Sequence, residues 1–243
     1  MSNAIKLALV IPTLNESGNI TTVLKRVTNA LSETNLDWEI VVVDDCSEDG
    51  TGNIVKEFAQ TNSRVRLVIR KGERGLAGAI TDGWWCSDAE LLGVIDADLQ
   101  HPPEVLTDLI EQICRGADIA IASRYVRPGS MDGWNPVRKL VSRVSVIVSL
   151  PVQRREIKVK DPLSGFFLVR RKCIDGLQFQ KTGFKLLLEI LATGRIGSVV
   201  EVPFRFGLRE AGASKANAMT GIRYMSLLLK LTLLRSAHPE QQN

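Results

Sequence analysis

The feature of this chain that most limits its fold is a repeated alternation of short apolar runs with segments of helical periodicity. The run "KLALVIP" (6–12) is continuously apolar, and residues 18–31 after it carry apolar side chains at helical spacing. Strand–helix repeats whose strands are apolar on both faces indicate a mostly parallel sheet covered by helices on both faces. We therefore predict an α/β fold. The expected strands are 6–12, 38–45, 64–70, 91–96 and 117–124, and the expected helices are 18–31, 51–60, 75–87 and 103–114.

Length and composition narrow the class of protein. A chain of 243 residues with 44% hydrophobic and 24% charged residues has enough material for one large domain with a sizeable core. Its net charge of +4 is too small to indicate a nucleic-acid partner, although anionic substrates and membrane surfaces fit it. The four cysteines have no CxxC spacing, which suits a reducing cytoplasm. No secretory signal and no apolar stretch of membrane-spanning length is recognised.

Polar side chains follow the expected strands, at the point where each strand ends. In parallel sheets, ligands bind beyond the carboxyl ends of the strands, so these side chains are predicted to share one rim. The alternative interpretation is that each of these residues is only a helix cap or a turn residue. We expect that role at the Asp49–Thr51 turn. The rim residues are Asn15, Glu16, Asp44, Asp45, Asp96, Asp98, Gln100 and Arg124.

The stretch "VIDADLQHPPE" (94–104) is the most informative of these strand ends. Asp96 and Asp98 stand two residues apart, and on an extended chain they would lie on the same side and repel each other. A divalent cation resolves that repulsion, and Gln100 adds a neutral oxygen, so the three residues predict a Mg²⁺ or Mn²⁺ site. An ion held by only a few protein oxygens keeps coordination positions open for substrate phosphates. A diphosphate ligand is therefore implied. For His101 beside it, we expect a structural role.

Several ordered motifs resemble one known family. "VIPTLNE", "VVVDDCSEDGT", "GLAGAITDG", "VIDADLQHPPE" and "ASRY" together look like the family 2 glycosyltransferases, which have the GT-A fold, a Rossmann-like sheet. "DPLSGFF" (161–167) and "REAGASK" (209–215) are similar to the dolichyl- and polyprenyl-phosphate mannosyltransferase branch of that family. The resemblance covers the chain from about residue 7 to residue 216. The chain lacks GxxxxGK[ST] and a GxGxxG after the first strand, so neither a P-loop NTPase nor a dinucleotide oxidoreductase is indicated.

The resemblance implies roles for particular residues. Asp98, Arg124 and Arg138 match catalytic positions, with the two arginines near the sugar and the acceptor phosphate. Leu14 stands where many members carry an aromatic residue, which leaves the donor base, guanine or uracil, open. The matched nucleotide and metal positions are Pro12, Leu14, Glu16, Val43, Asp45, Asp96, Ala97, Asp98 and Gln100, and the matched phosphate-closing cations are Lys185, Arg209 and Lys215.

The resemblance implies transfer of a hexose, with inversion, to a polyprenyl or dolichyl monophosphate. The expected donor is GDP-mannose, which supplies mannose. A lipid phosphate is already an anion near neutral pH, so it needs cations for positioning more than it needs a general base. One alternative is a UDP-sugar donor such as UDP-glucose. A second is a catalytically idle subunit that binds a nucleotide sugar, and a third is a nucleotidyltransferase. The third would need a glycine-rich basic loop after the first strand, which "PTLNESGN" does not offer.

Two segments bear on membranes and on domain organisation. Residues 135–160 include "RKLVSRVSVIVSL", whose serines and Arg138 share one helical face while Leu140, Val144, Ile147 and Val148 share the other. This segment is either a helix packed on the core or an amphipathic helix at a membrane interface, with the basic "RREIKVK" beside it. We expect a catalytic domain over 1–210 and an amphipathic helix with a flexible tail over 211–243. Peripheral association with the cytoplasmic face of a membrane is expected, with a membrane-embedded partner as an option.

Overall fold

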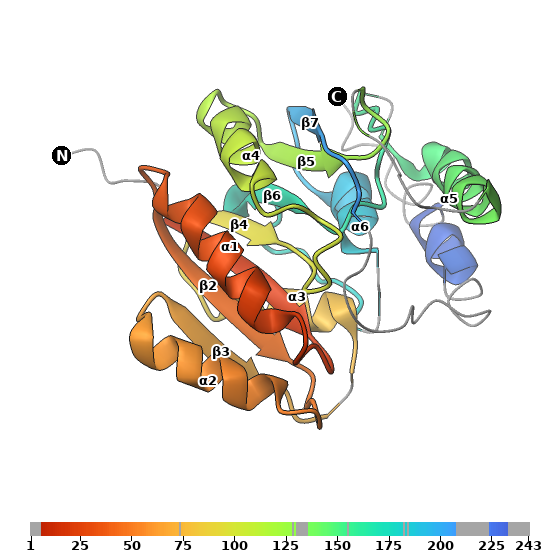
Figure 1. The fold of residues 1–243 in the computed structure, drawn as a ribbon. Helices are drawn as coiled ribbons and strands as arrows, with labels where there is room; N and C mark the ends of the chain where they lie inside the picture. The colour runs from red at the N-terminus through yellow and green to blue at the C-terminus, as the bar shows by residue number, and fades with distance from the viewer. Residues whose placement is uncertain are drawn as a thin grey trace.

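The computed structural model describes residues 6–72, 74–127, 129, 136–154, 156–181, 183, 185–207 and 224–232, without the side chains of Val137 and Arg138. Within them, seven strands form one sheet in the order β3-β2-β1-β4-β6-β5-β7 (Figure 1). The strands are β1 (Lys6–Thr13), β2 (Asp37–Asp44), β3 (Val65–Ile69), β4 (Leu91–Val94), β5 (Ile119–Ser123), β6 (Phe167–Arg170) and β7 (Val199–Pro203).

The sheet is parallel except at one strand. β1 pairs in parallel with β2 and with β4, β2 with β3, and β5 with β7, whereas β6 is antiparallel to both of its neighbours, β4 and β5. The register sets Thr13 against Asp44 and Ser123 against Pro203, so the carboxyl ends of these strands meet at one edge. This edge is the rim that the sequence predicts.

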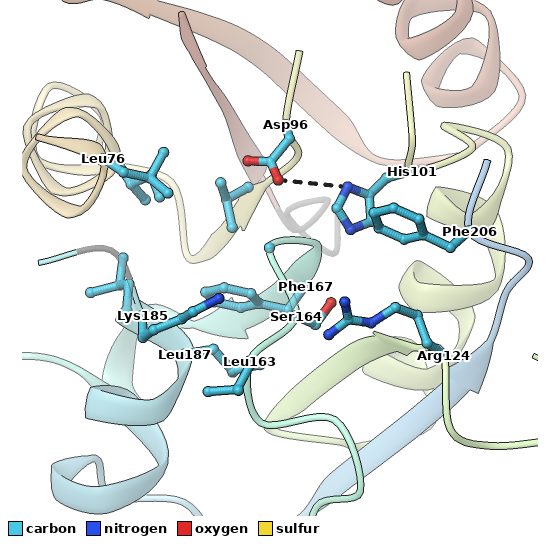
Figure 2. A pocket seen from close by; sticks show the side chains of 14 residues that line it. Leu76, Asp96, His101, Arg124, Leu163, Ser164, Phe167, Lys185, Leu187 and Phe206 are labelled. Atoms are coloured by element: carbon cyan, nitrogen blue, oxygen red, sulfur yellow. Dashed lines mark ion pairs between the residues drawn. The ribbon is translucent and has the colours of Figure 1, made fainter. Parts of the chain in front are cut away.

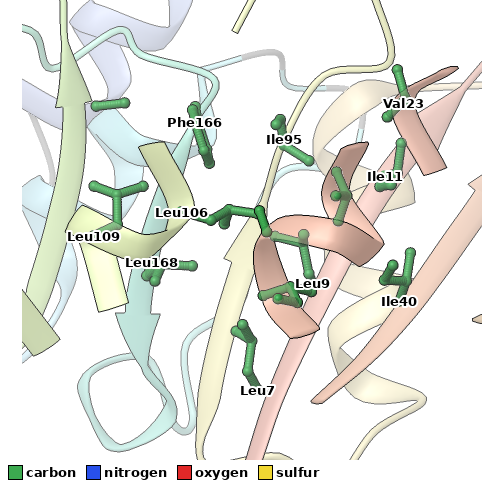
Figure 3. Close-up of a cluster of buried hydrophobic side chains, with 14 of the residues drawn as sticks. Leu7, Leu9, Ile11, Val23, Ile40, Ile95, Leu106, Leu109, Phe166 and Leu168 are labelled. Carbon is green, nitrogen blue, oxygen red and sulfur yellow. The ribbon is translucent and has the colours of Figure 1, made fainter. Parts of the chain in front are cut away.

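Helices cover both faces of the sheet, as the continuously apolar strands require. Alternate residues of β1 divide between two cores: Leu7, Leu9 and Ile11 face one side (Figure 3), and Ala8 and Val10 face the other. Helices α1, α2 and α4 bury their apolar stripes in the first core, and α3 and α6 in the second. The helices are α1 (Ile20–Ser32), α2 (Thr51–Thr61), α3 (Leu76–Trp85), α4 (Val105–Cys114), α5 (Pro136–Ser149) and α6 (Leu186–Thr193), with short 3-10 turns η1 (Leu150–Val152) and η2 (Arg171–Cys173).

A third apolar cluster lies at the side of the sheet, where α5 and the helix over residues 224–232 pack together (Figure 1). Val146 of α5 meets Tyr224, Leu227 and Leu231 there, and the Tyr224 hydroxyl donates to the Ser145 carbonyl at 2.5 Å. Neither these two helices nor any other in the described ranges has the length and apolar character needed to cross a membrane.

The five predicted strands and the four predicted helices between them are confirmed, with boundaries that differ by at most two residues. The sequence did not predict β6, β7 or α6. The largest consequence is that β4 and β5, which are consecutive in the prediction, are separated in the sheet by the antiparallel β6.

Candidate functional site

The rim loops after β1, β2 and β4 share an uncommon backbone conformation. Among the described residues, the non-glycine residues with positive φ are Asn15 (57°), Cys46 (59°) and Leu99 (60°), one in each of these loops. The left-handed region is costly for a side chain as large as leucine, and such strain gathers at functional sites. The three loops that the sequence marks by their polar residues are therefore also the ones where the backbone is most constrained.

The loop after β4 differs in shape from the sequence expectation. Asp96–Gln100 is a turn and not an extended continuation of the strand. The left-handed Leu99 reverses the chain, so the Asp98 carboxylate accepts the N–H of Gln100 at 3.1 Å and the Gln100 amide donates to the Gly207 carbonyl at 3.3 Å. The assumption that Asp96, Asp98 and Gln100 project from one side of an extended chain is therefore wrong. Asp98 and Gln100 are buried, while Asp96 is partly exposed.

Next to this turn lies a cavity of about 240 Å³ that collects charged side chains from distant parts of the chain (Figure 2). Asp96 from the end of β4, Arg124 from the end of β5 and Lys185 from the start of α6 all line it. Its remaining walls are mostly apolar. They are Leu76, Ile80, Val94, His101, Leu163, Ser164, Gly165, Phe167, Leu186, Leu187 and Phe206.

His101 forms part of the cavity wall as a buried, neutral ring. Its imidazole lies among Phe166, Phe204 and Phe206, with ring centroids 5.8, 5.3 and 5.1 Å away. Burial lowers its pKa to about 4, against the opposing pull of Asp98. Among the residues that the structure describes, its Nδ1 has no hydrogen-bond partner, and it lies 3.7 Å from Oδ2 of Asp96. A buried, unsatisfied nitrogen facing a carboxylate indicates that this corner is built for a further polar group.

The corner around Asp96 fits a divalent cation held largely by its ligand. Gly165 makes room for the carboxylate, because a Cβ there would lie 2.6 Å from Asp96 Oδ2. The described residues contain no group of three or more His, Cys, Asp or Glu side chains arranged to hold a metal ion. An ion beside Asp96 would therefore take most of its oxygens from a bound diphosphate, which is the way Mg²⁺ is commonly bound with nucleotides.

The two cations of the cavity are held differently. Arg124 forms a buried two-pronged ion pair with Asp161, with Nε 2.8 Å from Oδ2 and Nη2 2.7 Å from Oδ1. Lys185 points into the cavity from the opposite wall (Figure 2). Burial lowers the pKa of Lys185 to about 8, and the nearby Arg124 charge adds to that effect, while Asp96 and Asp161 oppose it.

A second group of rim residues lies at the ends of β2 and β3. The Asp45 carboxylate accepts a hydrogen bond from Arg70 at 2.5 Å and one from the Gly75 N–H at 2.9 Å. Arg70 also pairs with Asp82 of α3 at 2.9 Å. Gly75 directly precedes Leu76, which lines the cavity. The start of α3 therefore connects the Asp45 carboxylate to the cavity wall. Arg70 could not be recognised as a site residue from the sequence, because its two carboxylate partners are 25 and 12 residues away.

The other predicted residues divide into three groups. Pro12 and Val43 are buried in their strands, so only their backbones could meet a ligand, and Ala97 is buried in the turn. Leu14 and Glu16 are partly exposed in the loop after β1, where the Glu16 carboxylate accepts from the Asn19 amide at 2.9 Å. Arg209 and Lys215 lie outside the described residues, as does the side chain of Arg138. The expected Asp49 turn is confirmed, since its carboxylate accepts the Thr51 N–H and hydroxyl.

This sheet and rim define the GT-A fold. A mannosyl-3-phosphoglycerate synthase from Rubrobacter xylanophilus superposes with a TM-score of 0.68 at 17% identity, over 98% of this chain and 77% of that one. A glucosyl-3-phosphoglycerate synthase from Mycobacterium tuberculosis, solved with Mn²⁺, UDP-glucose and phosphoglyceric acid, superposes with a TM-score of 0.66 at 19% identity, over 95% of this chain and 79% of that one.

The chain belongs to glycosyl transferase family 2, whose model matches residues 8–177. It is 41% identical to a dolichol-phosphate mannosyltransferase of Pyrococcus furiosus, over 93% of this chain and 63% of the relative. It is also 31% identical to the Saccharomyces cerevisiae protein of that name, over 96% of this chain and 89% of the relative. Identity is 32% to a polyprenol monophosphomannose synthase of Mycolicibacterium smegmatis, over 92% of this chain and 84% of the relative. The chain thus spans under two thirds of the Pyrococcus protein.

Proposed function

We propose that this chain is a metal-dependent, inverting glycosyltransferase that moves mannose from GDP-mannose to a polyprenyl or dolichyl monophosphate. The observation that carries the proposal is its similarity to the three mannosyltransferase relatives over nearly its whole length. The charge arrangement in the cavity supports it: a partly exposed carboxylate, Asp96, faces the cations Arg124 and Lys185. This is the set of groups that a metal-bound diphosphate and a second phosphate require.

The donor would lie along the rim. The nucleoside would occupy the ends of β1 and β2, where Leu14, Glu16 and Asp45 lie and where Arg70 holds the Asp45 carboxylate in place. The diphosphate would lie beside Asp96, with Asp98 and Gln100 shaping the turn that presents it. Mg²⁺ or Mn²⁺ supplies Lewis-acid stabilisation of the charge that develops on the leaving diphosphate. Lys185 would add a positive charge beside the same oxygens.

The acceptor would approach from the side of β5. A lipid monophosphate attacks as an anion, so the chain need not supply a base, and its task is to place the phosphate against electrostatic repulsion from the donor. Arg124 lines the cavity on this side, and Arg138, Arg209 and Lys215 are proposed to add further cations. Attack opposite the leaving group inverts the anomeric centre and gives a β-linked product from an α-linked donor.

An exposed apolar surface beside the cavity supports peripheral association with a membrane. In α5 the serine side faces the domain, where Ser142 bonds the Tyr125 hydroxyl at 2.7 Å, and the apolar side faces outward. This apolar surface consists of Leu140, Val141, Val144, Ile147, Val148, Leu150, Met225 and Leu229. We propose that it rests on the cytoplasmic face of a membrane, alone or against a membrane-embedded partner, with residues 1–210 as the catalytic domain and 211–243 as its C-terminal attachment.

Polar substitution in the apolar surface should weaken vesicle binding. Leu140 and Ile147 are 63% and 62% exposed, so replacing both by serine removes apolar contact with lipid and leaves the core intact. We expect the double variant to bind anionic vesicles about ten-fold more weakly in co-sedimentation. Trp85→Ser removes a side chain that is 46% exposed at the far end of α3 and serves as the control. Equal binding by the double variant and the wild type would argue against this surface.

Nucleotide binding should weaken with rising pH because of Lys185. Its pKa of about 8 means that the free protein carries the ammonium below that pH and loses it above. The protonated form attracts the diphosphate, so GDP affinity should fall about ten-fold between about pH 7 and about pH 9. Calorimetric titration of GDP with Mn²⁺ present measures this fall. Lys185→Arg stays charged throughout, and a profile for that variant as steep as that of the wild type would place the titrating group elsewhere.

The donor base is decided by protection against thermal unfolding. With Mn²⁺ present, GDP at saturating concentration should raise Tm by several degrees, and UDP should leave it nearly unchanged. Protection by UDP alone would favour a UDP-sugar donor. Protection by GDP without turnover of GDP-mannose and polyprenyl phosphate would identify the idle nucleotide-sugar-binding subunit instead.

A further inference from the structure

Asp161 is a buried acid whose carboxylate pairs with Arg124. It is fully buried, and its carboxylate accepts three N–H groups from that residue: the backbone N–H at 3.0 Å, Nε at 2.8 Å and Nη2 at 2.7 Å. The pair joins the end of β5 to the loop before β6, 37 residues apart. Parallel N–H donation from a guanidinium to a carboxylate fixes the plane of the guanidinium as well as its position.

The loop that carries Asp161 is itself anchored from the far side. Glu201 of β7 accepts the backbone N–H groups of Lys160 and Asp161, both at 2.9 Å. The Ser164 hydroxyl donates to the Ala122 carbonyl at 2.7 Å. The loop that carries Asp161 is therefore anchored to β5 and β7 independently of Arg124. The Asp161 carboxylate thus has little freedom to follow a movement of the arginine.

Aromatic rings complete the support of the guanidinium. The Arg124 Cζ lies 5.5 Å from the centroid of Phe206 and 5.6 Å from that of Tyr125. Figure 2 shows the group extending into the cavity toward Ser164, with Lys185 on the opposite wall. Tyr125 also bonds Ser142 of α5, so Arg124 lies on the side of the cavity next to the apolar surface. An acceptor whose chain rests on that surface would bring its phosphate to this side.

We propose that Asp161 is a positioning residue for the transfer reaction. It sets the Arg124 guanidinium in the orientation that binds the acceptor phosphate, and Glu201 in turn fixes Asp161. The inference rests on the proposed function, because it assigns the Arg124 side of the same cavity to the acceptor. Asp161 also offsets part of the positive charge of Arg124 opposite Lys185, which favours two cations in one cavity.

Steady-state kinetics with both substrates varied test the proposal. Asp161→Asn keeps the shape of the side chain and removes its charge. The two-pronged interaction that holds the Arg124 guanidinium is thereby weakened. The KM for polyprenyl phosphate should rise about ten-fold or more, while the KM for the donor should stay within about two-fold. Asp118→Asn is the matched control: Asp118 accepts the N–H groups of Gly197 and Ser198 at the other end of β5, outside the cavity. It should move neither KM.

Three outcomes decide the matter. An acceptor KM within two-fold of the wild type, or a parallel rise of both KM values, would overturn the proposal, because a merely structural ion pair would affect both substrates or neither. If Asp161→Asn does not fold, Glu201→Gln is tested in its place. This variant should raise the KM for the acceptor alone, by about three-fold. An unchanged acceptor KM for Glu201→Gln would also overturn the proposal. Absence of transfer by the wild type under the same conditions refutes the proposed function itself, so the two failures are distinguishable.

Discussion

Asp96→Asn should lower the rate of mannosyl transfer by about a thousand-fold, equivalent to about 4 kcal/mol of transition-state stabilisation. Asn has the shape of Asp and lacks its charge, so the cavity is preserved and the partly exposed carboxylate of Asp96 is lost. The divalent ion then has a much weaker hold on the chain, and charge on the leaving diphosphate is stabilised less. Initial rates at saturating donor and metal measure the effect.

A control separates this effect from general damage. Asp88→Asn changes an exposed carboxylate that pairs with Lys6 at 2.5 Å. Asp88 precedes β4, at the opposite end of the strand from the rim, so this substitution should leave the rate unchanged. Tm of Asp96→Asn should stay within about 2 °C of the wild type, since Asn keeps the shape of the side chain and residue 96 is only partly buried. An active Asp96→Asn protein would show that the metal is held elsewhere or is not needed.

Gly165→Ala should reduce activity strongly with little loss of stability. The added Cβ would lie 2.6 Å from Oδ2 and 3.3 Å from Cγ of Asp96, so the carboxylate must turn away. A carboxylate at a cavity wall can move at low cost, but the metal corner is then misplaced. Displacements of this size near reacting groups cost about a hundred-fold in rate. We expect kcat to fall by that factor, with GDP-dependent binding of Mn²⁺ weakened in parallel.

Gly93→Ala is the matched contrast, because the same methyl group meets packed side chains there. Its Cβ would lie 2.6 Å from Leu168 Cδ2 and 2.8 Å from Leu9 Cδ1, inside the sheet core. Overpacking should lower the free energy of unfolding by about 1–3 kcal/mol and leave kcat nearly intact. If Gly165→Ala instead unfolded readily and kept its kcat, Gly165 would be needed for the fold and not for Asp96.

The parts of the fold that the sequence predicted are those with a clear period. β1, β2, β4 and β5 contain continuous apolar runs, and α1, α2 and α4 carry amphipathic stripes, whereas α3 was recognised by the glycines that open it. α6 was missed because Leu186–Leu191 is buried on nearly every side, which removes the polar face that marks a helix. β6 is four residues long and enters the sheet against the direction of its neighbours, a choice set by packing and not by local pattern.

The candidate site was predicted in part. The rim position of Asp96, Arg124 and Lys185 follows from the fold and from the family motifs, and the structure brings these three to one cavity. The turn at Leu99 could not be read, because leucine gives no sign of a left-handed backbone. The roles of Arg70 and Asp161 depend on partners distant in sequence. For α5 the sequence left two options, a helix packed on the core or an amphipathic helix at a membrane interface. The structure shows its apolar side exposed, and the membrane interface stays a proposal.

The most direct measurement of the central claim is transfer of radiolabelled mannose from GDP-mannose into the organic phase with a short polyprenyl monophosphate. We predict label in the lipid product when Mg²⁺ or Mn²⁺ is present, and loss of that label when EDTA removes the ion. Equal transfer in excess EDTA, or no transfer by folded protein supplied with metal, donor and acceptor, would contradict the account.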